Sequence, residues 1–191
     1  MKIEIFEIQN FDLEHEIADV YLNSWITTYK DLFDENLVNS VKKEDIINRR
    51  RRLLSLKHAC TFIAVYEKKV IGFCDLGKFR VHENIEISNQ RQIYSKPGEI
   101  YMMYILEKFQ RQGIGKKLFG QASKFLEQTN LYPFILWTLK NNKMACNFYE
   151  KLGGRIYGSI DIPVDKKRYI EIAYIFDDDS KPVINTQLNS C

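Results

Sequence analysis

The sequence predicts an α/β (α+β) domain, in which about four helices flank a sheet of about seven strands. Apolar runs of strand length alternate along the chain with segments whose apolar residues recur at helical spacing. The 191 residues, 45% of them hydrophobic, suit one packed domain, since about 100–200 residues is a typical size. Because no linker or internal repeat divides the chain, we expect a single domain over residues 1–176 and a loose C-terminal tail over residues 177–191.

The predicted strands are short runs rich in β-branched and aromatic residues. They cover residues 3–8, 61–66, 70–76, 99–106, 133–139, 154–160 and 168–176. Only the stretch 67–69 separates the second run from the third, which predicts a hairpin, and the last two runs predict another. The continuous apolar run from Ile100 to Leu106 predicts a central strand that is covered on both faces.

The predicted helices are segments whose apolar residues fall on one side. They cover residues 13–29, 43–56, 114–126 and 142–152, with Asp12 as the expected N-cap of the first. The second contains four consecutive arginines, Arg49–Arg52, which we expect to form a solvated basic face, because no aromatic residues are interleaved to favour nucleic acid. The polar stretch 80–97 predicts a loop near the substrate.

The link between the central strand and the next helix is a glycine turn at residues 110–115, with the sequence QRQGIG. The first N–H groups of a helix lack partners within the helix, and the helix dipole makes that end positive. Gly113 and Gly115 give a ligand access to the backbone, and Arg111, Lys116 and Lys117 add positive charge. The turn therefore predicts a phosphate site. It contains neither Gly-Lys-Ser/Thr nor G-x-G-x-x-G, which excludes a nucleoside-triphosphate loop and a dinucleotide fingerprint.

Two segments resemble motifs of the GNAT N-acetyltransferase superfamily, and the likeness extends over roughly residues 3–176. The pattern Q-x-x-G-x-G at residues 110–115 is similar to the family's acyl-CoA signature. The pattern N-x-x-A-x-x-F-Y-x-x-x-G at residues 142–153 is similar to its second conserved segment, except that Gly154 stands where the family usually has Phe. The resemblance implies the GNAT fold, a mixed and mostly antiparallel sheet whose central pair of strands is splayed.

The resemblance also implies that the chain binds acetyl-CoA. In the family, the loop amides hold the pyrophosphate of CoA, the preceding strand pairs with the pantetheine arm, and an asparagine of the second segment supports this arm. Carried over to this chain, the cofactor-binding residues are Met103, Tyr104, Ile105, Gln110, Arg111, Gln112, Gly113, Ile114, Gly115, Lys116 and Asn142.

The implied reaction is transfer of an acetyl group from acetyl-CoA to the primary amine of a small molecule, by direct attack in a ternary complex. By motif position Tyr149 is the acid that protonates the leaving thiolate. Glu99, at the start of the central strand, is a candidate general base, and water is the alternative. Trp25 and Tyr29 resemble residues that line the acceptor site in small-molecule members. The alternatives are a protein N-terminal or lysine acceptor and a non-catalytic acyl-CoA-binding module.

Composition narrows the class of protein further. A formal charge of +3 is too small to indicate a nucleic-acid or membrane partner. The four cysteines lack C-x-x-C spacing, so we expect neither a metal site nor a disulfide framework. The N-terminus does not resemble a signal peptide, and no apolar run approaches the ~20 residues that span a membrane, so we expect a cytoplasmic enzyme. The identity of the acceptor and the formation of a homodimer stay open.

Overall fold

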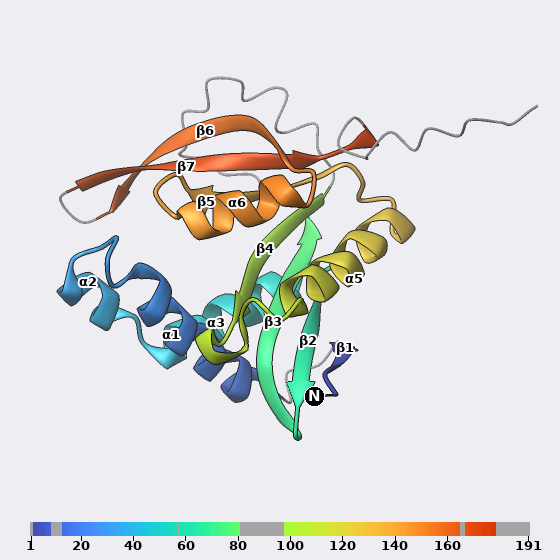
Figure 1. Ribbon diagram of the computed structural model, residues 1–191, viewed down its shortest axis with the longest axis horizontal. Coiled ribbons are helices and arrows are strands. Elements are labelled where there is room, and N and C mark those ends of the chain that lie inside the picture. The colour runs from blue at the N-terminus through green and yellow to red at the C-terminus, as the bar shows by residue number, and fades with distance from the viewer. Residues whose placement is uncertain (1, 9–12, 57, 81–97, 165–166, 179–191) are drawn as a thin grey trace, which may run out of the picture.

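The chain forms one seven-stranded sheet, with the strands in the order β1-β2-β3-β4-β5-β7-β6 (Figure 1). This computed structural model describes residues 2–8, 13–56, 58–80, 98–164 and 167–178. The expected N-cap Asp12, almost all of the expected loop at 80–97 and most of the expected tail lie outside the described residues.

The sheet is mixed and mostly antiparallel. Its strands are β1 (Glu4–Ile8), β2 (Cys60–Tyr66), β3 (Lys69–Lys78), β4 (Gly98–Ile105), β5 (Phe134–Leu139), β6 (Arg155–Val164) and β7 (Lys167–Phe176). All neighbours are antiparallel except the parallel pair of β4 and β5. The sheet predicted from the sequence is confirmed, and so are its two hairpins, β2–β3 and β6–β7.

The sheet divides between β4 and β5. These strands pair over only three positions, from Gly98 opposite Phe134 to Ile100 opposite Leu136. Beyond them β4 continues beside β3 to Ile105, whereas β5 continues beside β7. Figure 1 shows the β5–β7–β6 part turned away from the β1–β4 part. The central pair is therefore splayed, and the facing edges of β4 and β5 do not pair with each other past this point.

The helices are α1 (Glu14–Tyr29), α2 (Glu35–Ser40), α3 (Lys43–Leu54), α5 (Ile114–Gln128) and α6 (Lys143–Lys151), with a 3-10 turn at Glu107–Phe109. The four predicted helices are present, and α3 ends two residues earlier than predicted. The six-residue helix α2 was not predicted, because it is too short to show a period. Within the described ranges, no helix is long and apolar enough to cross a membrane.

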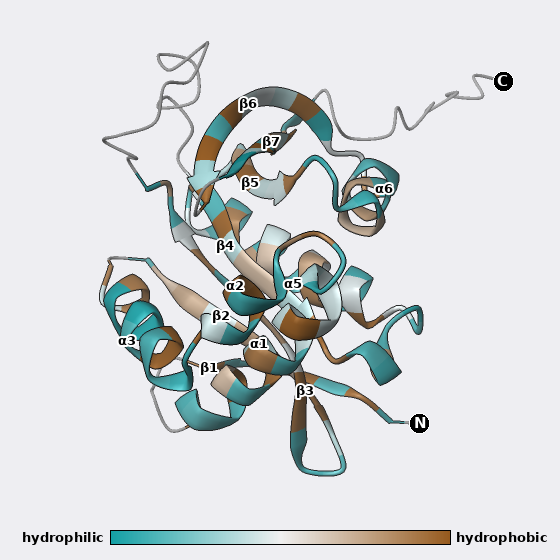
Figure 2. Ribbon diagram, turned by 90° about the vertical axis from the view of Figure 1, so that its left-hand side faces the viewer, coloured by the Kyte–Doolittle hydropathy of each residue, from teal (hydrophilic) through white to brown (hydrophobic). Residues whose placement is uncertain are grey.

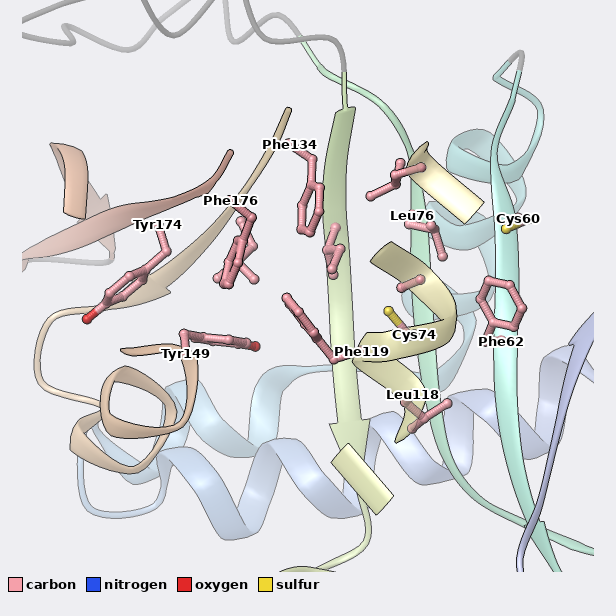
Figure 3. Packing of buried hydrophobic residues seen from close by; sticks show 14 of the residues in the cluster. Cys60, Phe62, Cys74, Leu76, Leu118, Phe119, Phe134, Tyr149, Tyr174 and Phe176 are labelled. Atoms are coloured by element: carbon pink, nitrogen blue, oxygen red, sulfur yellow. The ribbon is translucent and has the colours of Figure 1, made fainter. Parts of the chain in front are cut away.

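Helices cover both faces of the sheet. On one face, α1 and α3 pack over a core cluster that includes Ile47 and Phe73. On the other face, α5 and α6 pack over a larger cluster that includes Leu118, Phe134 and Phe176 (Figure 3). The rings of Phe134 and Phe176 stack with their centroids 5.1 Å apart, which joins β5 to β7 across this core.

The four arginines of α3 do not form one solvated face, which corrects the prediction from the sequence. Figure 2 shows mainly hydrophilic residues along α3, yet the side chain of Arg50 is buried, with 1% of its surface exposed. Its guanidinium donates to both carboxylate oxygens of Asp75, at 2.8 and 3.0 Å, and to the hydroxyl of Thr61. A buried charge is tolerated when it is paired in this way, so Arg50 fixes α3 to β2 and β3. Arg51 instead pairs with Glu14 of α1.

Candidate active site

A cavity of about 360 Å³ lies where β4 and β5 diverge. Its walls come from α1, β4, the turn before α5, the first turn of α5, the second half of β5, and α6. These elements belong to separate parts of the chain, and the splayed sheet brings them together. The turn, the first turn of α5 and the last residues of β4 form one part of the wall, and α1 with Tyr101 of β4 and Trp137 of β5 forms another. We call them the α5 end and the α1 end.

The α5 end is built to receive an anion. Gly113 precedes α5 with a φ of 79°, a conformation that favours glycine, and a Cβ there would meet nothing within 4 Å. The first bond within the helix runs from the N–H of Lys117 to the carbonyl of Gly113, so the three preceding N–H groups have no helical partner. No side chain caps them, and Arg111 and Lys116 also line the cavity. This arrangement fits the pyrophosphate of CoA.

Gly115 has a different function from the one expected. A Cβ at this position would lie 3.0 Å from the ring of Phe148 and 3.3 Å from the Cδ1 atom of Ile105. The missing side chain therefore lets α5 pack closely against α6 and the end of β4. Gly113 alone gives open access to the backbone, although Gly115 also contributes to the cavity wall.

The end of β4 offers a free strand edge to this cavity. Met103, Tyr104 and Ile105 pair with β3 on one side, and they lie past the last position at which β4 pairs with β5. The amide of Gln110 donates to the carbonyl of Ile105 at 2.9 Å and so fixes the turn to the strand. An extended amide-containing arm can therefore bind along β4 as an additional strand would.

Most of the predicted cofactor-binding residues meet at this cavity. Those in its wall are Met103, Tyr104, Ile105, Gln110, Arg111, Gly113, Gly115, Lys116 and Asn142. Gln112 and Ile114 are not in the wall: the Gln112 side chain binds the carbonyl of Lys108, and Ile114 is buried in the core. Any contact of these two residues with CoA would come from their backbone N–H groups.

Asn142 begins α6 as its N-cap. Its side-chain oxygen accepts a hydrogen bond from the N–H of Ala145 at 3.1 Å, which satisfies one of the unpaired donors at the helix start. The residue also lines the cavity. Because the oxygen serves the cap, the amide nitrogen is the better group for a bound ligand.

Tyr149 lines the same cavity from α6. Its ring packs against Phe148 and Tyr174, with centroids 5.3 and 6.0 Å away, and the residue is 8% exposed. Figure 3 shows its hydroxyl pointing from α6 toward β4. Burial raises the pKa of this phenol above its usual value, with smaller contributions from nearby Cys74, Tyr29 and Cys146. Tyr149 therefore stays protonated at neutral pH and can donate a proton inside the cavity.

The α1 end contains Ser24, Thr28, Tyr29, Tyr101 and Trp137. Of these, only Tyr29 was identified from the sequence. Burial raises the pKa of Tyr29 to about 12, so this hydroxyl is also neutral. Trp137 was missed because a single aromatic residue in a buried strand has no feature that distinguishes a wall residue from a core residue.

Trp25 does not line the cavity. Its indole N–H donates to the carbonyl of Val38 at 3.2 Å and so ties α1 to α2. Its ring lies between Tyr21 and Tyr29, with centroids 5.9 and 4.3 Å away. Trp25 therefore packs against Tyr29, a residue of the cavity wall, without being part of the wall itself.

Glu99 is completely buried beside the cavity and is not part of its wall. One carboxylate oxygen accepts from the backbone N–H and the Nε of Arg80, at 3.0 and 3.1 Å, and the other accepts from the Nη2 of the same residue. The Arg80 guanidinium also lies 4.7 Å from the ring centroid of Tyr101. Arg80 therefore occupies both oxygens of the candidate base.

Comparison with known proteins agrees with this geometry. The model of the family described as "Acetyltransferase (GNAT) family" matches residues 14–154. The protein named uncharacterized N-acetyltransferase YuaI of Bacillus subtilis (strain 168) is 31% identical over 128 residues, which are 66% of each chain. The chain thus spans about two thirds of the length of this relative.

Two solved structures show the same fold. PaiA N-acetyltransferase from Thermoplasma acidophilum, in complex with coenzyme A, is 21% identical with a TM-score of 0.67, covering 90% of this chain and 98% of that one. A structure from Bacillus anthracis, described as a candidate streptothricin acetyltransferase in complex with acetyl coenzyme A, is 24% identical with a TM-score of 0.53, covering 66% of each chain.

The fold and the cavity define an acyl-CoA-binding α/β protein, and the family model covers most of the chain. The chain belongs to the GNAT acetyltransferase family. Membership places it in the class of acetyl-CoA-dependent N-acetyltransferases, in agreement with the name of its relative and with the CoA and acetyl-CoA bound in the similar structures. The family, the fold and the acetyl donor predicted from the sequence are confirmed.

Proposed function

We propose that this protein transfers the acetyl group of acetyl-CoA to the primary amine of a small molecule, by direct attack in a ternary complex. The observation that carries the proposal is one cavity whose wall combines the uncapped start of α5, aromatic and polar residues from α1, β4 and β5, and Tyr149. Both substrates can be present together in such a cavity, so the chemistry needs no acetylated enzyme.

The residues of the chain account for two requirements of amide formation. Negative charge that develops on the thioester oxygen is stabilised by a backbone N–H, which the free edge of β4 near Tyr104 and Ile105 supplies. The leaving thiolate takes a proton, and the hydroxyl of Tyr149 is the donor. The raised pKa of Tyr149 supports this function, because the phenol stays protonated until the thiolate forms.

The third requirement is removal of a proton from the attacking ammonium, since only a neutral amine has a lone pair. Glu99 is poorly disposed to accept this proton, because Arg80 engages both of its oxygens. Of the two routes that the sequence leaves open, we therefore propose water within the cavity as the proton acceptor. Glu99 then orients Arg80, which packs on Tyr101 in the cavity wall.

Contacts of the segment that follows α1 favour a small acceptor over a protein. The ring of Phe33, just past α1, meets Tyr169 of β7 edge-on with centroids 4.8 Å apart. Nearby, Lys167 and Asp34 form an ion pair at 3.0 Å. These contacts join the α1–α2 segment to the β6–β7 hairpin, which Figure 1 shows approaching each other at one side of the molecule. An extended peptide needs an open groove here, whereas a small amine needs only a pocket.

The test has two parts. Calorimetry with acetyl-CoA measures donor binding, and release of free CoA thiol measures transfer to amines, amino acids, polyamines and aminoglycosides. We expect micromolar or tighter donor binding, about −8 kcal/mol or better, and turnover with at least one of these small amines. Binding without turnover of any small amine, combined with acetylation of peptides, would favour the protein-acceptor alternative.

A further inference from the structure

Ser24 of α1 carries a buried hydroxyl that has no partner. The residue is 1% exposed, and its Oγ makes no hydrogen bond within the described part of the chain. By contrast, Thr27 in the same helix and Ser55 at the end of α3 each donate to the carbonyl four residues earlier. Ser24 makes no such bond to its own helix. Because Ser24 belongs to the cavity wall, a ligand in the cavity can supply the missing partner.

The indole N–H of Trp137 is a second buried donor that lacks a partner among the described residues. The chain has two tryptophans, and the other, Trp25, donates its N–H to the carbonyl of Val38 at 3.2 Å. Trp137 lies on β5 opposite the small residue Ala173 of β7, and it also belongs to the cavity wall. A buried indole N–H usually finds a partner, because an unpaired donor costs free energy. The cavity can therefore supply this partner too.

These two donors belong to a wall that offers no carboxylate. Where described residues form the wall, its charged side chains are Arg111, Lys116 and Lys151, and none is Asp or Glu. The nearby carboxylate of Glu99 has both oxygens engaged by Arg80. A polyamine would find cations and hydrogen-bond donors here, whereas an oxygen atom would find groups that bind it. The wall therefore disfavours a polycation and favours an acceptor that carries oxygen.

From these observations we propose that Ser24 and Trp137 determine the specificity for the acceptor by donating hydrogen bonds to its oxygen atoms. The acceptor class is then a small amine with a hydroxyl, carbonyl or carboxylate oxygen, in place of an alkylamine or a polyamine. A serine hydroxyl changes direction by rotation about χ1 alone, so Ser24 can turn toward a ligand without a shift of α1. The inference rests on the proposed function, because it names the class of small amine that this cavity accepts.

The first test measures the melting temperature of the free protein. Ser24→Ala removes an unpaired buried hydroxyl and puts the residue of highest helix propensity into α1, so the melting temperature should not fall. Ser123→Ala is the matched control, since Ser123 is a half-buried serine inside α5 and is not part of the cavity wall. A clear drop in Ser24→Ala, absent in Ser123→Ala, would mean that the hydroxyl already has a partner in the free protein, which overturns its assignment.

The second test compares amines in which a hydroxyl replaces a methyl group. Thiol release is measured with L-alaninol against 2-aminobutane and with 2-amino-1-phenylethanol against 2-phenylpropylamine, with L-alanine as the carboxylate and spermidine as the polycation. We expect the wild type to prefer the hydroxyl amine of at least one pair in kcat/KM. In Ser24→Ala and in Trp137→Phe this preference should fall by about three- to tenfold, the value of one hydrogen bond. In Ser123→Ala it should persist.

The change in preference between variants isolates the side chain, because the two amines of a pair keep their own difference in basicity in every variant. Both cavity variants should keep their affinity for acetyl-CoA. A wild type that prefers spermidine or the methyl-bearing amines keeps the proposed function and overturns this inference. A preference that both Ser24→Ala and Trp137→Phe leave intact overturns the assignment of the two donors. Acetyl-CoA binding without turnover of any of these amines contradicts both proposals.

Discussion

The two ends of the cavity are built in different ways. The α5 end presents main-chain groups, namely the uncapped N–H groups at the start of α5 and the free edge of β4. The α1 end presents side chains, such as Tyr29 from α1 and Trp137 from β5. A site made of backbone is fixed by the path of the chain, whereas a site made of side chains changes with every substitution.

This difference fits the different demands on the two ends. A cofactor shared by a whole family can be held by backbone groups that most sequences supply, provided that the glycine turn is kept. An acceptor that differs between members has to be selected by side chains. We therefore expect substitutions at the α5 end to matter when they block the backbone, and substitutions at the α1 end to matter through the groups they remove.

The largest effect is expected at Tyr149, which lines the same cavity as both ends. Tyr149→Phe keeps the ring and its packing and removes only the hydroxyl. General acid catalysis typically contributes ~10²–10⁴-fold, so the single-turnover rate of acetyl transfer should fall by about that factor while the affinity for acetyl-CoA holds. Because burial raises the pKa of this phenol, the wild-type rate should not fall as the pH rises toward 10, the usual pKa of tyrosine.

Two other results would count against this function of Tyr149. An unchanged single-turnover rate would mean that the thiolate leaves without help or takes its proton from another group. A lower rate together with a lower melting temperature would mean that Tyr149 acts through its packing against Phe148 and Tyr174.

The next largest effect should come from blocking the backbone at the α5 end. Gly113→Asp places a side chain and a negative charge in the open space at the helix start, at a φ that only glycine adopts easily. We expect the affinity for acetyl-CoA to drop by about 10- to 100-fold, equivalent to about 1.4–2.7 kcal/mol. Calorimetry measures this loss.

Gly120→Asp is the matched control. Gly120 lies on the same helix, and a Cβ there also meets nothing within 4 Å, but the residue is not part of the cavity wall. The same charge on the same helix should leave the affinity within about twofold, because exposed charges are screened over about 10 Å. Equal losses in the two variants would mean that α5 as a whole, and not its start, binds the cofactor.

A smaller effect is expected from the support of the α1 end. Trp25→Phe keeps an aromatic ring next to Tyr29 and removes the hydrogen bond to Val38. Loss of one such bond costs about 1 kcal/mol, which lowers the melting temperature of a domain of this size by about 2–4 °C. The acceptor KM should rise several-fold, with an unchanged affinity for acetyl-CoA. Thr27→Ala removes a half-buried hydroxyl that donates only to carbonyls of the preceding turn of the same helix, and it should do neither. An unchanged acceptor KM in Trp25→Phe would mean that Trp25 does not position Tyr29 for binding of the acceptor.

The sequence predicted the α5 end better than the α1 end, because the residues of the α5 end are neighbours in the sequence and those of the α1 end are not. The α5 end is local: strand, turn and helix start follow one another within residues 99–126, so their spacing can be read directly. The α1 end needs residues far apart in the sequence, such as Ser24 of α1 and Trp137 of β5, and only the tertiary fold brings them into one cavity. Short-range patterns carry no information about such contacts.

Single positions show how pattern reading fails. The run Arg49–Arg52 looks uniform in the sequence, yet Arg50 is buried against Asp75 while Arg52 is exposed, because the helix turns each side chain by about 100° relative to the last. Gly115 belongs to the glycine motif, but it serves the contact of α5 with Phe148. Glu99 stands at the expected strand, and its function depends on Arg80, a partner that a sequence pattern does not reveal.

The smallest effect should come from a charge at the α5 end. Lys116 lines the cavity from the first turn of α5, and Lys116→Ala keeps a residue with high helix propensity. If backbone N–H groups provide most of the binding, this variant should lose only about two- to fivefold in affinity for acetyl-CoA, and less at 0.5 M salt, because exposed charge interactions are weak and screened.

Lys117→Ala is the control for Lys116→Ala, since the neighbouring lysine is exposed and is not part of the cavity wall. It should change the affinity less than Lys116→Ala does, and the difference between the two should shrink as salt is added. A loss of 100-fold or more in Lys116→Ala, larger than that of Gly113→Asp, would reverse the comparison between the two ends. The cofactor would then be held mainly by side-chain charge, and the α5 end would be as open to substitution as the α1 end.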